Sequence, residues 1–367
     1  MSSARIGVGI VGLSAERGWA AKAHVAALAM LDDFELRGLV GSSPDSVRAA
    51  AATHGVAHAS DRLECLLERR DIELVVVSVK VPEHRHLVQA CLRAGKAVLC
   101  EWPLARNLAE AEALAEVARE TGRPCFVDLQ ARGSPAVRYI GDLLQQGYVG
   151  RVLSTSVLAA VGAPWGGERI RRSELIYQVR ENGATMLSIP VGHMLDTLCC
   201  LLGEFESPRA TLACQRSRAA LADCEGTIPV TSPDQVCISG CFAQGAVGCL
   251  HYRAAFKRGT PFHWQINGTA GDILVQAAHA HPQFGGLRIQ GAGAGAPALE
   301  PLEVPQPYWT LAGTQAGDRS SVAYNVALVY RQIALDLRTG SARAPSLADA
   351  LLLHRRLDAI ERAAAAR

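Results

Sequence analysis

Two side chains in the middle of the chain are of the right type to move a proton. His193 lies in the run Ser188–His193, at the predicted start of an apolar helix, and the ordinary pKa of histidine suits proton transfer near neutral pH. Tyr177 is a second candidate, because a phenol can donate to a developing alkoxide or amide anion. Each has a structural alternative, a hydrogen-bonded core histidine or a packed aromatic ring. From position alone a core histidine is somewhat favoured at His193, which remains the first acid–base candidate, with Tyr177 as the second.

A glycine-rich loop near the N-terminus can hold a phosphate. Gly7–Gly12 match G-x-G-x-x-G letter for letter, but that reading leaves too short a strand before Gly7 and places Ile10 and Val11 in a turn. We expect a strand over 6–11 instead, followed by a loop whose backbone N–H groups and helix start bind a pyrophosphate. The alternative is a strand-to-helix turn with no ligand. The predicted contacts are Gly12, Leu13, Ser14, Arg17 and Gly18, with Trp19 opening the helix.

The end of the second predicted strand, 34–40, carries no acid. Dinucleotide-binding folds that use NAD place Asp or Glu there, on the ribose 2′-hydroxyl. Here Ser42, Ser43 and Arg48 follow the strand and can accept a 2′-phosphate, which favours NADP(H) and leaves NAD(H) possible. The alternative is that Ser43 only caps the helix that begins at Pro44 and that Arg48 is solvated.

The elements that position these residues alternate between strand and helix over the first third of the chain. The run over 74–79 is wholly apolar and β-branched, as in a strand buried on both faces. Repeated strand–helix units predict a right-handed, doubly wound parallel sheet of the Rossmann type, the α/β class. We assign residues 1–130 to this dinucleotide-binding domain. Its predicted strands are 6–11, 34–40, 74–79, 97–100 and 124–129.

The pattern changes after residue 130, where a helix over 135–146 is followed by strands and hairpins. We assign 131–367 to a C-terminal α+β domain with a large, mostly antiparallel sheet, which binds substrate and mediates oligomerisation. Its stretch 285–307 is rich in Gly, Ala and Pro and is predicted to be a loop. The sheet has more face than its few helices can cover, so we expect a homodimer or a dimer of dimers.

Composition excludes several classes of protein. Apolar residues make up 49 %, charged residues 20 %, and the net charge is +2 with no long run of one sign, so neither nucleic-acid nor membrane binding is expected. No secretory leader or membrane span is seen. The eleven cysteines include no Cys-x-x-Cys pair and are predicted to be buried thiols in a reducing cytoplasm. His279 and His281 lack further ligands, so no metal site is predicted.

Many ordered segments resemble the Gfo/Idh/MocA oxidoreductases, and within them the branch of the fungal galactose-regulon co-repressor. Glu101-Trp102-Pro103 is similar to the Glu-Lys-Pro signature of that family. The resemblance covers nearly the whole chain, and each segment alone would be weak. The other matching segments are 11–14, 18–24, 129–135, 147–150, 176–177, 192–196, 268–272 and 349–355.

The resemblance implies a role for each matching residue. Glu101 and Pro103 would shape the wall beside the nicotinamide, and His193 and Asp196 would lie on the helix that faces the substrate. We place Trp102 in the substrate pocket, together with Trp165, which can instead be plain packing. The further residues on the cofactor side are Val79, Pro82, His84, His86, Gln130 and Arg132.

Two departures from the family pattern shape the functional expectation. Trp102 stands where the family has its catalytic lysine, and Ile189 stands where an aspartate precedes the histidine by one helical turn. A carbonyl needs a donor for its oxyanion, whereas a protonated imine already carries its proton. We expect an NADPH-dependent reductase of an imine or carbonyl group in a small metabolite. The alternative is a dinucleotide-binding sensor or regulatory protein without turnover.

Overall fold

Six parallel strands with nearly continuous apolar sequences form the sheet of the first unit, in the order β3-β2-β1-β4-β5-β6. The computed structural model describes residues 4–16, 18–166, 169–254, 259, 261–310 and 318–366. This sheet confirms the predicted doubly wound, Rossmann-type architecture. The strands are β1 Ile6–Val11, β2 Phe34–Val40, β3 His58–Ser60, β4 Leu74–Val77, β5 Ala97–Glu101 and β6 Cys125–Asp128.

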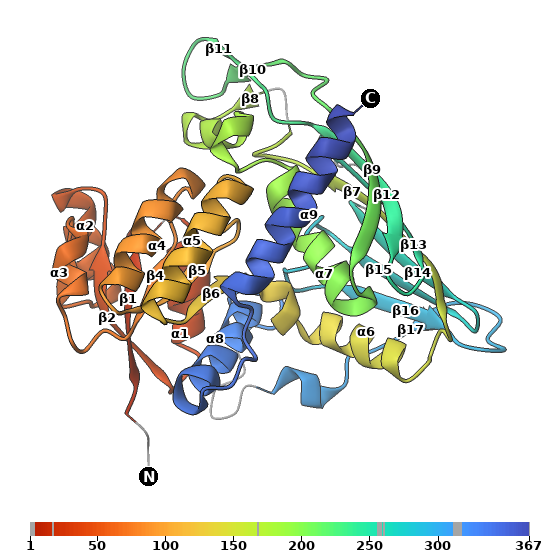
Figure 1. Cartoon of the computed structure of the whole chain (residues 1–367), viewed down its shortest axis with the longest axis horizontal. Helices are drawn as coiled ribbons and strands as arrows, with labels where there is room; N and C mark the ends of the chain where they lie inside the picture. The colour runs from red at the N-terminus through yellow and green to blue at the C-terminus, as the bar shows by residue number, and fades with distance from the viewer. Residues whose placement is uncertain are drawn as a thin grey trace. The chain divides into compact units, whose positions relative to one another are not determined.

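Local signals set the helix ends of this unit. The Ser43 hydroxyl accepts from the Ser46 N–H at 3.3 Å, Pro44 takes the first helical position, and Gly55 ends the helix with a φ of +66°. Helices α4 and α5 lie side by side in Figure 1. The helices between the strands are η1 Ala20–Val25 (a π-helix), α1 Ala26–Leu28, α2 Pro44–His54, α3 Leu63–Leu67, η2 Val81–Glu83, α4 His84–Arg93, α5 Leu108–Thr121 and η3 Gln130–Gly133.

The division of the chain differs from the predicted 1–130 and 131–367. Unit 1 comprises 1–133 together with 310–352, and unit 2 comprises 134–309 together with 353–367. The late segment joins unit 1 because α8 Val322–Thr339 packs against η1, α1 and η3. Helix α9 Leu347–Ala365 runs through both units.

An eight-stranded, mostly antiparallel sheet forms most of unit 2, as predicted, in the order β17-β16-β15-β14-β7-β13-β12-β9. Strands β7 and β13 pair in parallel. The predicted loop over 285–307 is wrong in part, because two short strands extend the sheet there despite their glycines. The strands are β7 Val152–Val161, β9 Phe205–Ala213, β12 Gln235–Phe242, β13 Val247–Ala254, β14 Phe262–Gly268, β15 Asp272–Ala277, β16 Arg288–Ala292 and β17 Glu300–Pro301.

Alternation along these strands gives the sheet one buried and one open face. Trp264 and Tyr252 lie in the core, whereas Leu158 and Val247 are 57 % and 52 % exposed on the open face. Helices α6 and α7 lie on one side of the sheet in Figure 1. The helical elements of this unit are α6 Pro135–Gln145, η4 Arg172–Tyr177, η5 Arg180–Asn182, η6 Leu187–Val191, α7 Gly192–Leu202 and η7 Gln306–Trp309.

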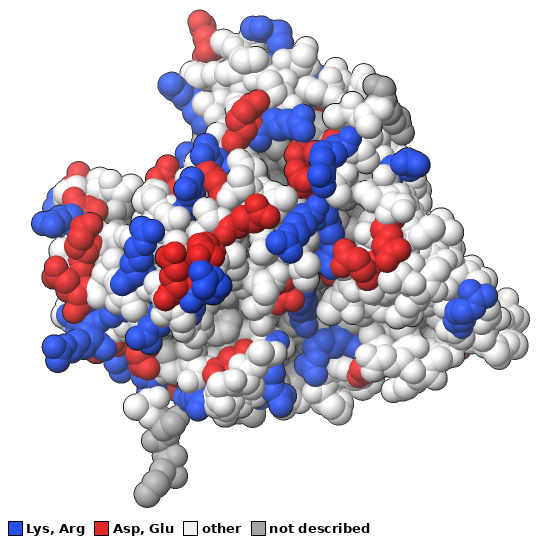
Figure 2. All heavy atoms as spheres, viewed as in Figure 1, with Lys and Arg blue, Asp and Glu red and all other residues white. Residues whose placement is uncertain are grey.

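A small three-stranded sheet completes unit 2, in the order β11-β10-β8, around a core of Ile170, Ala219 and Leu221. Among the described residues no helix is long and apolar enough to cross a membrane. Figure 2 shows acidic and basic side chains interspersed on the face in view. The small strands are β8 Arg169–Ile170, β10 Arg218–Leu221 and β11 Thr227–Pro229.

The cysteines depart from the prediction of buried thiols. All eleven are free, but only part of them lie in the core. Cys237 and Cys249 are exposed on the open face of the large sheet, because strand alternation turns them away from the core although their neighbours are apolar.

Candidate functional site

The turn after β1 has the geometry of a dinucleotide loop. Gly7 and Gly9 lie inside β1, where a Cβ would collide with Asp71 and Leu66, so the literal G-x-G-x-x-G match is a strand feature, as predicted. Gly12 has a φ of +97°, and a Cβ on it would lie 2.3 Å from the Ser78 carbonyl oxygen. Only glycine lets the chain pass this close to the end of β4, as the first strand-to-helix turn of a dinucleotide-binding fold requires.

The rest of the predicted phosphate loop frames the start of η1. Gly18 has a φ of +91°, and Trp19 precedes the helix as expected. Leu13 is buried, and the Ser14 carbonyl oxygen is 3.0 Å from Nε2 of His54. Arg17 lies outside the described residues.

The segment after β2 keeps the predicted donors at the start of α2. Ser42 is exposed. The Ser43 hydroxyl already caps the helix, and the Arg48 guanidinium forms an ion pair with Asp45 at the exposed surface. A 2′-phosphate would therefore meet the Ser42 hydroxyl and the N–H groups of α2, and would compete with Asp45 for Arg48.

Glu101 anchors the centre of unit 1. Its Oε1 is 2.6 Å from Nε2 of His24 and accepts the Trp19 indole N–H at 2.8 Å. The other ring nitrogen of His24 is 2.9 Å from the Tyr330 hydroxyl on α8. Two proton arrangements satisfy the chain: Tyr330 donates to His24 Nδ1 while Nε2–H donates to Glu101, or a protonated Glu101 donates to Nε2 while Nδ1–H donates to Tyr330. The side chain of Glu101 therefore points into unit 1.

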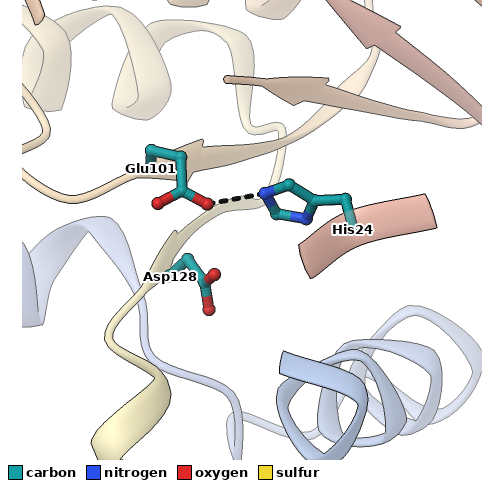
Figure 3. A group of neighbouring side chains, drawn as sticks. All are labelled: His24, Glu101 and Asp128. Atoms are coloured by element: carbon teal, nitrogen blue, oxygen red, sulfur yellow. Dashed lines mark hydrogen bonds and ion pairs between the residues drawn. The ribbon is translucent and has the colours of Figure 1, made fainter. Parts of the chain in front are cut away.

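A second carboxyl group lies beside this chain (Figure 3). Asp128 ends β6, is fully buried, and lies with its carboxyl group beside that of Glu101. Burial raises the pKa of Glu101 to about 8. Burial also raises the pKa of Asp128, and the charge of Glu101 raises it further. Burial lowers the pKa of His24. Burial thus disfavours the charged form of each side chain in the cluster.

The same three side chains offer possible metal ligands, each with one atom within 4.8 Å of the other two. Ligands that share one small divalent ion sit about 2.1 Å from it and about 3 Å or more from each other. The direct 2.6 Å contact between His24 and Glu101 is shorter than that spacing. A direct hydrogen bond between His24 and Glu101 explains this contact better than a metal ion bound by both side chains.

The other residues predicted beside the cofactor take structural contacts in unit 1. Trp102 is buried, and His84 places its ring nitrogens 2.8 Å from the Pro103 carbonyl oxygen and 3.1 Å from that of Val79. His84 thus fixes the Glu-Trp-Pro segment to the end of β4. The remaining positions vary in exposure: Pro82 is half-buried, His86 is exposed beside Glu83, Gln130 is buried, and Arg132 pairs with Asp349 at 2.8 Å.

Unit 2 carries the predicted acid–base candidates. His193 is 4 % exposed on α7, and its Nδ1 has no hydrogen-bond partner among the described residues. Burial lowers the pKa of His193 to about 3, and the nearby His281 lowers it further. This differs from the expected titration near neutral pH, because a dry site penalises the imidazolium. At neutral pH His193 is an uncharged hydrogen-bonding group.

The structure brings Tyr177 and Trp165 together, with ring centroids 5.5 Å apart. Burial raises the pKa of Tyr177, and the charge of Glu174 raises it further, so its phenol keeps its proton. Burial lowers the pKa of Arg356 on α9, but its hydrogen bond with Glu204 raises it, with the smallest contribution from the charge of Asp196, which is buried on α7.

The sequence reasoning did not select His24, Asp128 or Tyr330. His24 appeared only within a matching segment, although it follows the phosphate loop. Asp128 gave a usable signal, because it ends an apolar strand at the edge where parallel sheets bind ligands. Tyr330 gave no usable signal in the sequence, because its contact with His24 joins residues 306 positions apart.

Replacing Glu101 with Gln should flatten the pH dependence of stability. A pKa raised to about 8 means that the folded protein favours the protonated carboxyl group of Glu101. The stability that this group contributes is therefore fully present below pH 4.5 and is lost as the pH rises through 8. Glu101→Gln mimics the protonated form and keeps its acceptor. The free energy of unfolding of the wild type, measured with guanidinium, should fall relative to the variant by up to about 1.4 kcal/mol per pH unit.

The control for this experiment is Glu120→Gln, an exposed position on α5, which should follow the wild type at every pH. Asp128 contributes a pH dependence of stability with the same sign as that of Glu101, and His24 contributes one with the opposite sign. Both residues remain in every variant. If the free energies of unfolding of the wild type and of Glu101→Gln changed in parallel between pH 5 and 8, Glu101 would be ionised in the folded protein.

Known proteins similar to this chain fall into two groups. Residues 6–129 match the model of the oxidoreductase family with an NAD-binding Rossmann fold, and residues 135–277 match that of the Gal80p C-terminal domain. Dehydrogenase aclE of Aspergillus oryzae is 33 % identical over 75 % of this chain and 77 % of its own length. The galactose/lactose metabolism regulatory protein GAL80 of Kluyveromyces lactis is 30 % identical over 75 % of this chain and 64 % of its own length.

Solved structures show the same fold. A super-repressor mutant of Gal80p from Saccharomyces cerevisiae aligns with a TM-score of 0.86 at 23 % identity, covering 99 % of this chain and 96 % of its own. The matching segments therefore run through both units, and the relatives include enzymes as well as regulators. The chain belongs to the Gfo/Idh/MocA oxidoreductase family.

Proposed function

We propose that this protein is an NADP-dependent oxidoreductase that reduces an imine or carbonyl group in a small metabolite. The observation that carries the proposal is the buried His193, whose Nδ1 has no partner among the described residues and is available to a ligand. Family membership and the Gly12 turn support a dinucleotide in unit 1. A small molecule, and neither nucleic acid nor membrane, is the proposed partner.

The residues of unit 1 fit the cofactor at two places. The Gly12 turn passes against the end of β4, where a Cβ would meet the Ser78 carbonyl oxygen, and leads to the start of η1, whose N–H groups would bind a pyrophosphate. Beyond β2, the exposed Ser42 and the start of α2 would meet the ribose 2′ group of a dinucleotide bound as in this class of fold. These contacts support NADP(H), with Arg48 as a further ligand once it leaves Asp45.

The chemistry favours an imine over a carbonyl. When bound, the nicotinamide supplies a hydride to the substrate carbon, and the electron pair of the C=N or C=O bond moves to nitrogen or oxygen. An oxyanion then needs a proton, and His193, neutral with a pKa of about 3, cannot supply one as an imidazolium at neutral pH. A protonated imine becomes a neutral amine without that proton. His193 can instead orient the nitrogen by a hydrogen bond, with Tyr177 as the proton donor for a carbonyl.

A second function has its own support. Trp102 occupies the position of the family lysine and is buried, and one group of relatives is regulatory. A dinucleotide sensor would bind NADPH without oxidising it. Incubation of the protein with NADPH and a panel of imines and ketones separates the two: oxidation of NADPH supports the enzyme, and tight binding without oxidation supports the sensor.

Removing the imidazole should impair turnover. His193→Ala is expected to lower kcat by about 10² or more, because a hydrogen bond that orients the reacting nitrogen is lost. The wild-type kcat should show no ionisation near pH 6.5 from this residue, since burial holds its pKa at about 3. Steady-state kinetics between pH 5 and 9 measure both effects.

The control for this variant is His58→Ala, at an exposed position on β3, which should keep the wild-type rate. An unchanged kcat in His193→Ala, with NADPH affinity intact, would remove His193 from the mechanism and leave Tyr177 or solvent. If the pH profile of kcat showed an ionisation near pH 6.5 in the wild type but not in His193→Ala, His193 would titrate as an acid–base group.

NADPH should bind more tightly than NADH. Ser42→Asp is expected to weaken NADPH binding selectively, because a carboxylate would repel the 2′-phosphate. Arg48→Ala should reduce the preference by a smaller factor, since Asp45 already engages that guanidinium. Fluorescence titration of both cofactors gives the dissociation constants. Equal affinities in the wild type, or a preference for NADH, would refute the assignment.

We propose that the open face of the large sheet is buried in a homodimer. Leu158 and Val247 are 57 % and 52 % exposed there, on the adjacent strands β7 and β13. Leu158→Glu should produce monomers at micromolar concentration, because a buried carboxylate would be desolvated without a partner. The control is Leu352→Glu on α9, which is 44 % exposed. A monomeric wild type by light scattering would contradict the proposal.

A further inference from the structure

Five rings of unit 2 lie in mutual contact. His281 and Phe284 are nearly stacked, with centroids 4.7 Å apart and planes at 34°. Trp165 lies 5.5 Å from Tyr177 and 6.1 Å from His281, and His279 meets Phe284 edge-on at 5.5 Å. All five rings are half-buried, so each keeps part of its surface accessible. We call these five residues the ring wall.

Hydrogen bonds hold the ring wall together and engage its polar edges. The Trp165 indole N–H donates to the Ala184 carbonyl at 3.2 Å, and His279 Nε2 is 2.7 Å from the Gly285 carbonyl oxygen. The Gln178 amide, next to Tyr177, donates to the Pro164 carbonyl at 2.6 Å, which joins the two segments that carry Trp165 and Tyr177. These bonds engage the Trp165 indole N–H and one ring nitrogen of His279, so the faces of these two rings are the parts that can pack on an apolar group.

The ring wall adjoins His193. His281 lies close enough to His193 for its charge to act on it. The carbonyl that binds Trp165 belongs to Ala184, in the segment that leads into η6 and then α7, where His193 sits. A group held by the imidazole of His193 would therefore have the rings beside it.

We propose that the ring wall binds a planar aromatic ring of the substrate, adjacent to the reacting C=N bond. This inference rests on the proposed function and specifies its substrate class. Aromatic pairs stack or meet edge-on with gains of about 0.5–1.5 kcal/mol beyond apolar burial. The faces of Trp165 and Tyr177 also attract a cation, and a protonated imine conjugated to an aryl ring is a planar cation.

A sugar is a poorer match for the same surface. Carbohydrates also pack on aromatic rings, but each hydroxyl then needs a polar partner. The indole N–H of Trp165, the Nε2 of His279 and the amide N–H of Gln178 are committed to backbone carbonyls. Binding several hydroxyls here would break those bonds, whereas an aryl group keeps them.

A matched pair of cyclic imines tests the assignment. The probes are 2-phenyl-1-pyrroline and 2-cyclohexyl-1-pyrroline, which share the reacting C=N bond and differ in the flatness of the second ring. Wild-type protein with NADPH should show kcat/KM about 2- to 13-fold higher for the phenyl compound, the factors that 0.5–1.5 kcal/mol gives. Calorimetry with the two product amines measures the same preference without turnover.

Substitutions in the ring wall test whether its rings cause the preference for the phenyl compound. Trp165→Leu should remove most of this preference and leave NADPH affinity unchanged, whereas Trp165→Phe should retain most of the preference. The matched control is Tyr139→Leu, which breaks another edge-to-face pair of this unit, with Tyr308 at 5.4 Å, and should keep the preference.

The outcomes separate this inference from the function beneath it. Selective binding of the phenyl amine without any NADPH oxidation supports the ring wall and refutes the reductase. Reduction of both imines at equal rates supports the reductase and overturns the ring wall. A phenyl preference that survives Trp165→Leu, or no binding of either amine, also overturns it.

Discussion

The carboxyl group of Glu101 is the constraint on which the organisation of unit 1 depends. Through one oxygen it accepts from the indole of Trp19 and joins His24, and through His24 it reaches Tyr330 on α8. Those contacts connect the start of η1, the end of β5 and a helix some 300 residues later. They explain why 310–352 belongs to unit 1. A buried polar group needs partners, so the chain has to return to supply them.

Two parts of unit 1 therefore have different roles. Glu101 joins segments of the unit to one another, while Gly12 and the start of α2 provide the surface that suits a dinucleotide. Burial raises the pKa of both Glu101 and Asp128, which disfavours two negative charges side by side in this cluster.

The sequence predicted those elements whose signals are local. Ser43, Pro44 and Gly55 set both ends of α2, and the apolar run over 74–77 identified a central strand. It did not predict β16, because the glycines of 285–307 resemble a loop until β15 supplies a pairing edge. Nor did it predict the Glu101 cluster or the ring wall, since both join segments distant in sequence, and the two histidines of the wall had been considered only as metal ligands.

The dryness of unit 2 near His193 connects its electrostatics with its shape. A site that lowers the pKa of a histidine to about 3 disfavours any localised charge, including the oxyanion of a reduced carbonyl. A cation spread over a conjugated ring is disfavoured less, because its charge is diffuse and aromatic faces compensate part of the lost hydration. The absence of the family lysine also suits the proposed cationic substrate, since an ammonium group would repel it. The dry surroundings of His193 and the ring wall, both in unit 2, are therefore the features that support the proposed flat, cationic substrate.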